Sequence, residues 1–157
     1  MKVSEIMTRD VVTVRVDTPI REVARILAQH QISGVPVCSA DGRLAGVVTE
    51  YDLIAKPQAR TAGDAMERNV ISVMEDTDVE DVRYLLVERK IRRVPVVRDH
   101  QVIGIVSRSD LVREMALGWV CESCGELARA ERPPESCPKC GTRRGFDPAR
   151  VPPGGVD

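Results

Sequence analysis

Four of the five cysteines stand in two matched pairs near the C-terminus. Cys121 and Cys124 belong to a CxxCG phrase, and Cys137 and Cys140 belong to a CPxCG phrase, with twelve residues between the pairs. Each phrase is typical of a tight turn that directs two thiolates toward one point, closed by a glycine that can adopt a positive φ. Four thiolates in a tetrahedral arrangement suit Zn²⁺ or iron. The spacing therefore predicts a metal site, which we assign to Zn²⁺ with iron as the alternative.

A redox-active pair or a set of disulfides are the other interpretations of these cysteines. Two matched turns favour the metal over both. A segment this small cannot build a core of its own, so we expect it to fold only with its metal bound. Cys38 stands apart from the four and follows the phrase VPV, where we expect it to be a small buried residue.

A second phrase with chemical potential occurs twice, as GVVTEYD at residues 46–52 and GIVSRSD at residues 104–110. The hydroxyl and the aspartate three residues later resemble a capping box, which would only satisfy the first N–H groups of a helix. Alternatively, the aspartate accepts hydrogen bonds from the two hydroxyls of a ribose, while the helix N-terminus favours a phosphate. Aspartate is shorter than the usual Glu or Gln of a capping box, so we expect it to reach the N-cap amide poorly. The two interpretations are compatible.

The two phrases belong to a tandem duplication. Residues 7–37 align with residues 66–96 at an offset of 59, and the offset becomes 58 after the turn SADGR, which is one residue longer than RDHQ. Each copy predicts strand, helix, strand, strand, helix, with first strands at residues 11–14 and 70–73 and with Thr18 as the N-cap of the first helix. Gly46 and Gly104 lack a Cβ and allow a ligand or the facing repeat to approach the backbone. The fold class is α+β, with two units that pack sheet against sheet about a pseudo-twofold axis.

This order of elements, written twice around VPV and G-aliphatic-aliphatic-[ST]-x-x-D, resembles a pair of cystathionine β-synthase (CBS) domains, the Bateman module. We assign CBS repeat 1 to residues 1–59 and CBS repeat 2 to residues 60–117. The resemblance implies a regulatory sensor that binds an adenosine compound, such as AMP, ADP, ATP or S-adenosylmethionine, between the repeats. Arginines stand before the second VPV, in RKIRRVPV, whereas the first copy reads HQISGVPV. This asymmetry favours one phosphate site over two.

Carried over residue by residue, the resemblance implies two sites of unequal strength. The main site would use Val12, Ile32, Arg92, Arg93, Ile105, Ser107, Ser109 and Asp110. The weaker mirror site would use Val47, Thr49, Tyr51, Asp52, Ile71 and Ile91. An ordinary solvated strand end is the other interpretation of the two arginines.

Residues 118–147 form the third predicted domain, a small β-rich ribbon. The stretch from Trp119 to Phe146, including PPESCPKCG, resembles the rubredoxin-like domain of rubrerythrin and, more generally, a zinc ribbon. Such domains usually carry an aromatic residue after the first CG, where this chain has Glu126. This departure argues against an electron-transfer role. Residues 148–157 are rich in Pro and Gly, and we expect a flexible tail there.

Composition narrows the classes of partner. The net charge of −1 and the aromatic content of 3% disfavour a nucleic-acid partner, and no apolar run is long enough for a membrane span or a secretory signal, so we expect a cytoplasmic protein. We expect no enzyme, because neither histidine stands in a recognisable catalytic motif. Three functions follow: an adenosine sensor coupled to the metal ribbon, a redox protein with an iron-tetrathiolate centre, and a transcription- or RNA-associated adaptor. Related modules dimerise through exposed helices, so we expect a homodimer with a further protein partner that the sequence does not name.

Overall fold

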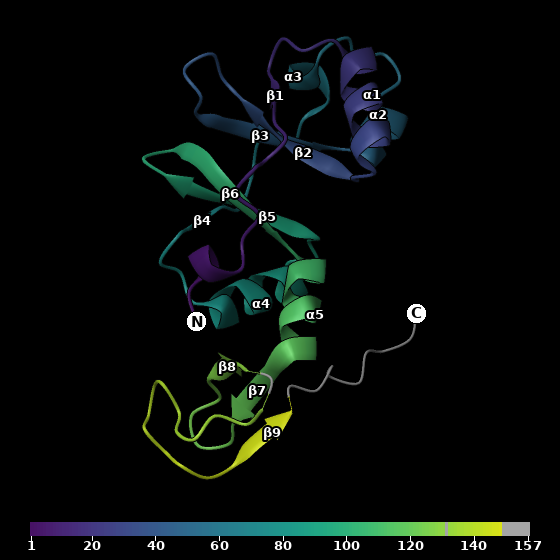
Figure 1. The fold of residues 1–157 in the computed structure, drawn as a ribbon. Coiled ribbons are helices and arrows are strands. Elements are labelled where there is room, and N and C mark those ends of the chain that lie inside the picture. The colour runs from purple at the N-terminus through teal and green to yellow at the C-terminus, as the bar shows by residue number, and fades with distance from the viewer. Residues whose placement is uncertain (131, 149–157) are drawn as a thin grey trace. The chain divides into compact units, whose positions relative to one another are not determined.

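The computed structural model describes residues 1–130 and 132–148, and the predicted tail therefore lies almost entirely outside the described residues. The chain divides into two compact units. The sheet unit comprises Thr8–Glu75 and Val94–Ile105, and the helix–ribbon unit comprises Met1–Met7, Asp76–Arg93 and the chain from Val106 onward. Figure 1 shows the elements of each unit.

The sheet unit carries the strands of both repeats. Repeat 1 supplies β1 (Val14–Arg15), α1 (Ile20–His30), β2 (Gly34–Cys38), β3 (Leu44–Thr49) and α2 (Glu50–Ala55). Repeat 2 begins with the short helix α3 (Ala62–Ala65), which was not predicted. Repeat 2 supplies β4 (Val73–Met74) and most of β5 (Arg93–Arg98) and β6 (Gln101–Ser107). The two three-stranded sheets have the same order, β1-β2-β3 and β4-β5-β6. The predicted duplication is therefore a duplication of topology.

The helix–ribbon unit begins with the 3₁₀ helix η1 (Val3–Glu5). The backbone at the start of this helix forms hydrogen bonds with residues 77–79 of repeat 2. Val3 N–H donates to Thr77 O at 2.8 Å, and Val79 N–H donates to Met1 O at 3.0 Å. The remaining elements are α4 (Val79–Glu88), α5 (Arg108–Leu117), β7 (Gly118–Cys121), β8 (Leu127–Arg129) and β9 (Phe146–Pro148). Among the helices of the described residues, none combines the length and the apolar character that a membrane crossing requires.

The first strand of each repeat is shorter than predicted. Residues 11–14 and 70–73 were expected to form strands, but β1 begins at Val14 and β4 begins at Val73. Val14 pairs in parallel with Val37, so one residue earlier the partner would be Pro36, which has no N–H to donate. Val73 pairs with Val96 after Pro95 in the same way. The proline of each VPV phrase therefore ends the parallel pairing that the β-branched residues suggested.

The start of α1 also differs from the prediction. Pro19, not Thr18, is the N-cap of this helix, and the hydroxyl of Thr18 instead accepts a hydrogen bond from the Arg15 N–H at 2.9 Å. Thr18 therefore closes the turn that precedes the helix. The apolar face that was predicted for the helix is present, because Val23 and Leu27 are buried.

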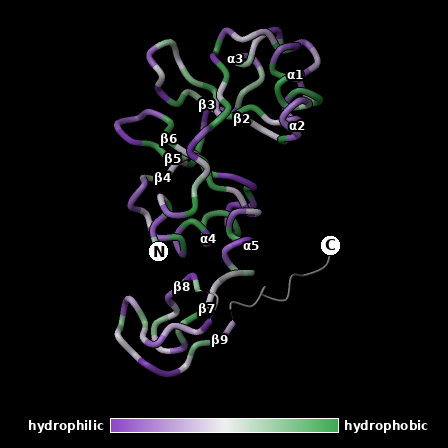
Figure 2. The backbone as a smooth tube through the Cα atoms, in the orientation of Figure 1, coloured by the Kyte–Doolittle hydropathy of each residue, from purple (hydrophilic) through white to green (hydrophobic). Residues whose placement is uncertain are grey.

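The length difference between the repeats lies in the hairpin turns, as predicted. In repeat 2 the turn is made by Asp99 and His100, which both have positive φ, the geometry of a two-residue hairpin loop. In repeat 1 the longer turn uses Gly42 at φ 84° and is followed by a register shift beside Cys38. Figure 2 shows hydrophilic residues in such connections and hydrophobic ones along the strands.

The core of repeat 1 lies between its sheet and α1. Its buried residues are Val14, Val23, Leu27, Val35, Val37 and Val48, and the start of repeat 2 adds Ala62, Ala65 and Met66. All of β2 is buried, including Cys38, and burial raises the pKa of this thiol above its ordinary value. This agrees with the prediction that Cys38 is a small core residue.

Gly46 is the point at which the start of repeat 2 comes closest to β3. Val47 and Glu67 exchange two backbone hydrogen bonds, of 3.0 and 2.8 Å. A Cβ at position 46 would lie 2.6 Å from the Glu67 carbonyl oxygen and 2.8 Å from the Met66 sulfur. The glycine is therefore required by the facing repeat, which is one of the two reasons that the sequence suggested.

We expect Gly46→Ala to lower the free energy of unfolding by about 1–3 kcal/mol, because the added methyl group meets backbone that cannot move without breaking this bridge. Urea denaturation followed by circular dichroism measures the change. Arg25→Lys, at an exposed position of α1, is the control and should leave the midpoint nearly unchanged. Equal midpoints for Gly46→Ala and wild type would contradict the contact.

Candidate functional site

A three-stranded sheet holds the C-terminal ribbon together. Its order is β8-β7-β9, with β7 antiparallel to both neighbours. The indole N–H of Trp119, the single tryptophan of the chain, donates to Ala130 O at 3.0 Å. Because Cys121 ends β7, the sheet fixes the position of the first cysteine.

The four predicted metal ligands come together at one point. The sulfur atoms of Cys121, Cys124, Cys137 and Cys140 all lie within 4.8 Å of one another. Cys121 Sγ lies 3.7 Å from Cys140 Sγ, and Cys124 Sγ lies 3.6 Å from Cys137 Sγ. Sulfurs held tetrahedrally at about 2.3 Å from a Zn²⁺ lie about 3.8 Å apart, whereas a disulfide brings them to about 2 Å. The spacing fits a shared tetrahedral ion.

The two turns have the conformation that the sequence predicted. Gly125 and Gly141 both have φ of 74°, and their N–H groups donate to the carbonyls of Cys121 and Cys137 at 2.8 and 2.9 Å. A Cβ on either glycine would meet nothing within 4 Å. Positive φ, and not lack of space, is therefore the reason for glycine at both positions.

Backbone donors make this cluster suited to negative charge. The N–H of Cys140 and the N–H of Lys139 point at Cys137 Sγ and lower the pKa of this thiol to about 6. The Glu126 N–H acts in the same direction on Cys124, but burial and the neighbouring thiols raise the pKa of Cys124 to about 12. Four thiolates this close repel one another, and a bound divalent cation is the group that offsets the repulsion.

The ribbon follows helix α5 without a linker, and an ion pair holds the ribbon against this helix. Gly118 follows Leu117 directly and begins β7. The carboxylate of Glu114 on α5 is 4% exposed and receives the guanidinium of Arg129 from β8, with Arg129 Nε 2.7 Å from Glu114 Oε2 and a second ion pair through Nη2. A Cβ on Gly118 would lie 2.6 Å from Leu127 Cδ1. The ribbon is therefore packed against the end of α5.

Glu126 forms a second ionic contact between the ribbon and the rest of its unit. Its carboxylate pairs with the amino group of Met1 and lies 3.4 Å from Lys139 Nζ. Burial opposes ionisation, but these two cations hold the pKa of Glu126 below its usual value. The residue that stands where rubrerythrin-type domains have an aromatic therefore serves an electrostatic contact.

The repeated [ST]-x-x-D phrases both form helix caps. Asp110 Oδ2 accepts from the Ser107 N–H at 2.7 Å and from the Ser107 hydroxyl at 2.9 Å. Asp52 does the same with Thr49, at 2.8 and 2.9 Å. The expectation that aspartate reaches the N-cap amide poorly was wrong, because the extended backbone of the cap residue brings its N–H to the shorter side chain.

Capping does not use the whole of either carboxylate. The bonds to Ser107 and Thr49 all end on Oδ2, and the other oxygen of Asp110 lies 3.4 Å from Arg113 Nη2. Asp110 is 7% exposed, so its second oxygen is held in place within the protein. The capping interpretation is therefore confirmed for both aspartates, and ribose binding by the second oxygen stays a prediction.

Hydrogen bonds join the first residue of α5 to the residues just before β5, where the predicted arginines stand. The Arg108 N–H donates to Arg92 O at 3.0 Å, and Arg108 Nε donates to Ile91 O at 2.9 Å. In repeat 1 the equivalent bond runs from Glu50 N–H to Ser33 O at 2.9 Å. The sequence analysis did not predict a contact of Arg108 with this segment. Aligning the repeats at the offset of 58 would have found this residue, since it stands opposite Glu50.

The other predicted ligand residues are divided between the two units. Ser107, Ser109 and Asp110 lie together on the first turn of α5, where the hydroxyls of Ser107 and Ser109 are 2.8 Å apart. Of the rest, Arg92, Arg93 and Ile91 belong to the helix–ribbon unit, and Val12, Ile32, Ile105, Val47, Tyr51 and Ile71 belong to the sheet unit. Tyr51 is 75% exposed. The predicted apolar residues at positions 12, 32, 47, 71, 91 and 105 are partly buried.

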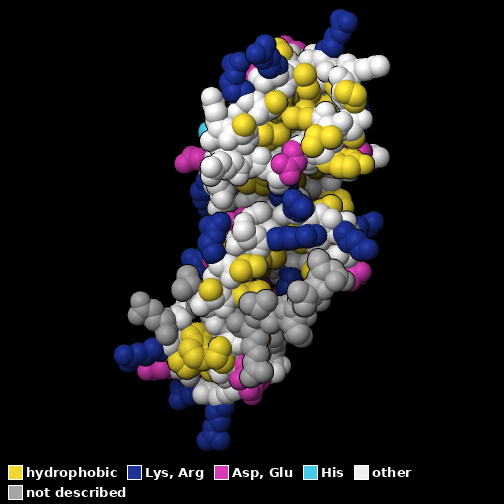
Figure 3. Space-filling model, turned by 90° about the vertical axis from the view of Figure 1, so that its right-hand side faces the viewer, with side chains coloured by type: hydrophobic (Ala, Val, Ile, Leu, Met, Phe, Trp, Pro, Cys, Tyr) yellow, Lys and Arg dark blue, Asp and Glu magenta, His cyan; other side chains and the backbone are white. Residues whose placement is uncertain are grey.

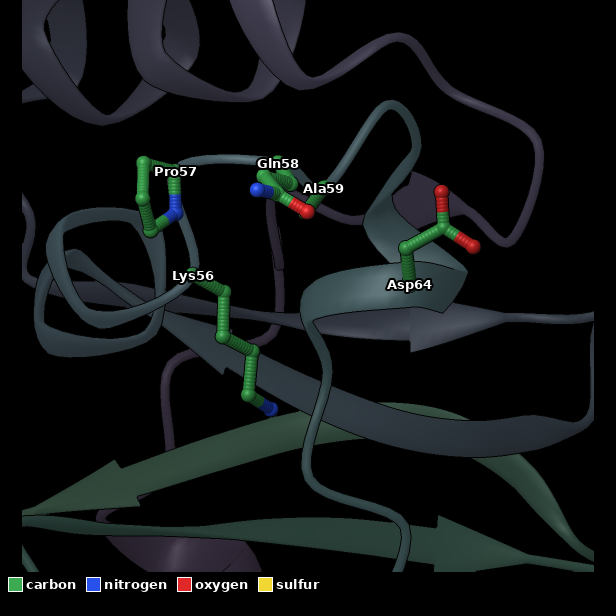
Figure 4. A pocket seen from close by; sticks show the side chains of 5 residues that line it. All are labelled: Lys56, Pro57, Gln58, Ala59 and Asp64. Carbon is green, nitrogen blue, oxygen red and sulfur yellow. The ribbon is translucent and has the colours of Figure 1, made fainter.

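A cavity of about 440 Å³ lies between the end of α2 and α3, and none of the predicted ligand residues lines it. It is lined by Lys56, Pro57, Gln58, Ala59 and Asp64. Figure 4 shows the side chains of Lys56 and Asp64 pointing away from each other. Lys56 Nζ donates to Ala65 O at 2.8 Å, and Asp64 accepts the N–H groups of Arg60 and Thr61. Both charged groups are therefore engaged by the local backbone.

The fold and the cysteine cluster define a pair of similar α+β repeats with an attached four-cysteine ribbon. The CBS domain family matches residues 3–58 and 62–117, and the rubrerythrin, rubredoxin-like domain matches residues 119–146. The chain belongs to the CBS-domain family and carries a C-terminal rubredoxin-like domain.

Among its relatives, Hypoxic response protein 1 of Mycobacterium tuberculosis is 28% identical over 118 residues, which cover 71% of this chain and 82% of the relative. L-aspartate semialdehyde sulfurtransferase of Methanocaldococcus jannaschii is 36% identical over 115 residues, which cover 71% of this chain and 22% of that protein. These alignments span about the length of the two repeats.

Two of the similar solved structures hold adenosine compounds. CBSX2 of Arabidopsis thaliana in complex with AMP has a TM-score of 0.68 and 32% identity, over 71% of this chain and 93% of that one. The CBS domain pair of protein MJ0100, in complex with 5-methylthioadenosine and S-adenosyl-L-methionine, has a TM-score of 0.67 and 33% identity, over 72% and 94%. Hypoxic Response Protein I, solved with two coordinated zinc ions, has a TM-score of 0.66 and 28% identity, over 72% and 98%.

We expect Cys137→Ser to abolish stoichiometric metal and to unfold the ribbon, because a ribbon of this size has little apolar core to replace the metal. Metal analysis and the emission of Trp119 measure the two effects separately, and the emission should shift to the red. Circular dichroism should show the repeats still folded.

Cys38→Ala is the matched control, since Cys38 is buried in β2 and should leave metal content and Trp119 emission unchanged. Full metal content in Cys137→Ser would exclude the four-thiolate site.

Proposed function

We propose that this protein is a regulatory sensor that binds an adenosine compound, with AMP as the first candidate, mainly at the site of repeat 2. The unequal charge of two otherwise equivalent caps carries the proposal. At aligned positions, repeat 2 has Arg92, Arg93 and Arg108 around Asp110. Repeat 1 has Ser33, Gly34 and Glu50 around Asp52.

These charges act at a place that already favours an anion. The start of each helix carries the positive end of the helix dipole, and α5 has ten residues whereas α2 has six. Hydrogen bonds from the Arg108 backbone and guanidinium hold the start of α5 against the residues that lead into β5. Three arginines and a helix N-terminus together suit a phosphate, whereas Glu50 repels one.

Each predicted ligand residue takes a role within this proposal. Asp110 binds the ribose hydroxyls through Oδ1, the oxygen that the cap does not use and that lies 3.4 Å from Arg113 Nη2. Ser107, Ser109, Arg92 and Arg93 bind the phosphate, with Arg108 as an addition from the structure. The apolar residues Val12, Ile32 and Ile105 would receive the adenine. Val47, Thr49, Tyr51, Asp52, Ile71 and Ile91 form the weaker mirror site.

The ribbon is proposed to bind Zn²⁺ through Cys121, Cys124, Cys137 and Cys140 and to transmit the state of the repeats to a protein partner. A redox role with iron is the second candidate, and the match to the rubredoxin-like domain favours it. Metal analysis distinguishes them, and a ferric tetrathiolate is red whereas the zinc form is colourless. Reduced cysteines suit the cytoplasm, and we propose that the protein acts there without catalysing a reaction.

We expect Asp110→Asn to weaken AMP binding about tenfold to a hundredfold, because the loss of one charge-assisted hydrogen bond to the ribose is worth about 1.5–3 kcal/mol. Asparagine keeps an oxygen for the Ser107 cap, so this variant separates ligand binding from helix stability. Asp52→Asn is the matched variant in repeat 1 and should change the affinity much less. Isothermal titration calorimetry at fixed salt measures both.

Equal losses in the two variants would contradict the asymmetric site. If wild type binds neither AMP, ADP, ATP nor S-adenosylmethionine, the sensor function itself is wrong. Arg93→Ala should also weaken AMP binding severely, and more so at low salt than at high salt.

A homodimer is part of the proposed assembly. Tyr84 and Val87 on α4 and Val112 on α5 are 64%, 61% and 52% exposed, and α4 packs against α5. Figure 3 shows hydrophobic side chains at the surface among charged ones. Exposed apolar groups that belong to neighbouring helices suit contact with a second copy.

We expect light scattering to give a dimer mass at micromolar concentration for wild type and a monomer mass for Val87→Glu, because a charge at a shared apolar contact must be desolvated. Met74→Glu, an equally exposed apolar position on β4, is the control and should remain dimeric. A monomeric wild type would exclude the dimer.

A further inference from the structure

We propose that the Glu114–Arg129 pair couples the metal site of the ribbon to the adenosine site on α5, so that a metal-loaded ribbon strengthens AMP binding. This inference rests on the proposed function and assigns its regulation to two residues outside both sites. Glu114 and Arg129 are thus positioning residues.

Helical spacing connects the two sites along one element. Asp110 and Glu114 are four residues apart on α5, and both side chains are buried, at 7% and 4% exposure. They therefore share the buried face of this helix. Four residues after Glu114, Gly118 begins β7, and Cys121 ends it as the first metal ligand. One continuous stretch of chain thus carries the cap of the adenosine site, the carboxylate of the charged pair and a thiolate.

The Glu114–Arg129 ion pair is favourable only when both partners are present. A buried carboxylate is costly unless it is paired and hydrogen-bonded, and a planar guanidinium that meets both oxygens is its best partner. Arg129 supplies that geometry, with Nε toward Oε2 and Nη2 toward Oε1. Losing only the arginine would leave Glu114 buried without its counter-charge, and α5 would have to move or fray to hydrate it.

The position of Arg129 depends on the ribbon. Arg129 ends β8, and β8 is held by its ladder to β7, in which Gly118 pairs with Arg129 itself. A tetrathiolate ribbon of this size is ordered by its metal. Removing the metal therefore withdraws Arg129 from Glu114 and disturbs the helix whose first turn carries Asp110.

Thermodynamic linkage makes the effect reciprocal. If metal raises the affinity for AMP by some factor, AMP raises the affinity for metal by the same factor. A pair that only fastens the ribbon would change the stability of the ribbon and leave the AMP affinity unaltered. The AMP affinity with and without metal therefore separates coupling from simple attachment.

The test uses the full chain in its Zn²⁺-loaded form and after removal of the metal with a chelator, with Trp119 emission to confirm each state. We expect wild type to bind AMP on the order of tenfold more tightly when loaded. In Arg129→Gln and in Glu114→Gln, the loaded and metal-free forms should bind AMP equally. Metal content should stay stoichiometric in both variants, because neither residue is a ligand.

Arg143→Gln, at another exposed arginine of the ribbon, is the matched control and should retain the wild-type difference. Hydrogen exchange gives a second measurement, in which Zn²⁺ slows exchange in α5 of wild type and not in α5 of Arg129→Gln. Exchange in α1 should not change in either protein. If Glu114→Gln does not fold, Arg129→Gln alone decides, since Arg129 is about half exposed.

Wild type that binds AMP with the same affinity in both metal states, with unchanged exchange in α5, would overturn the coupling and leave the sensor function intact. Absence of AMP binding in both states would overturn both proposals. A metal effect that persists undiminished in Arg129→Gln would show that the coupling runs through other residues, and this too would overturn the assignment.

Discussion

The junction where β6 ends and α5 begins is the constraint on which the functional parts of this protein depend. At that point the aspartate side chain of Asp110 holds the N–H and the hydroxyl of Ser107, so the strand turns into a helix within one residue. The same arrangement forms at Thr49–Asp52. At Thr61–Asp64 the carboxylate likewise accepts the Thr61 N–H, and the Asp64 N–H donates to the Thr61 hydroxyl oxygen. A short aspartate used in this way fixes the helix start and keeps its own position fixed, which is what a ligand-binding carboxylate requires.

Duplication supplied the protein with two such junctions, and the surrounding charges made them unequal. A backbone hydrogen bond from the first residue of the helix to the residue just before the middle strand of the sheet is present in both repeats. Its donor belongs to Arg108 in one and to Glu50 in the other, so the same geometry presents opposite charge. A phosphate distinguishes such sites strongly, because attraction and repulsion act on it over the same short distance. The repeats can thus share a fold and differ in affinity.

The ribbon depends on the balance between repulsion among its four thiolates and their attraction to a bound cation. Its four sulfurs are brought together by two glycine-closed turns and by N–H groups directed at sulfur, an arrangement that is favourable only with a cation at the centre. The ribbon is nevertheless not an independent attachment. Its first strand continues α5, and Arg129 meets a carboxylate that the helix buries. The Glu114–Arg129 contact therefore ties the position of the ribbon to a buried charge on α5.

The sequence by itself determined the features that rest on local spacing: the duplication, the four thiolates, the glycine-closed turns, the repeat topology and the position of the length difference in a hairpin. The turns depend on residues a few positions apart, whose geometry is nearly independent of the rest of the chain, and the duplication and the two cysteine pairs are visible as repeated patterns. The tertiary structure decided the others. Proline in the central strand shortened β1 and β4, the extended cap residue let aspartate close the capping box, and Gly46 proved to face Glu67. Arg129 and Glu114, fifteen residues apart, meet only because β7 reverses direction into β8 after α5 ends, and no periodicity of the sequence records a contact between a helix and a ribbon.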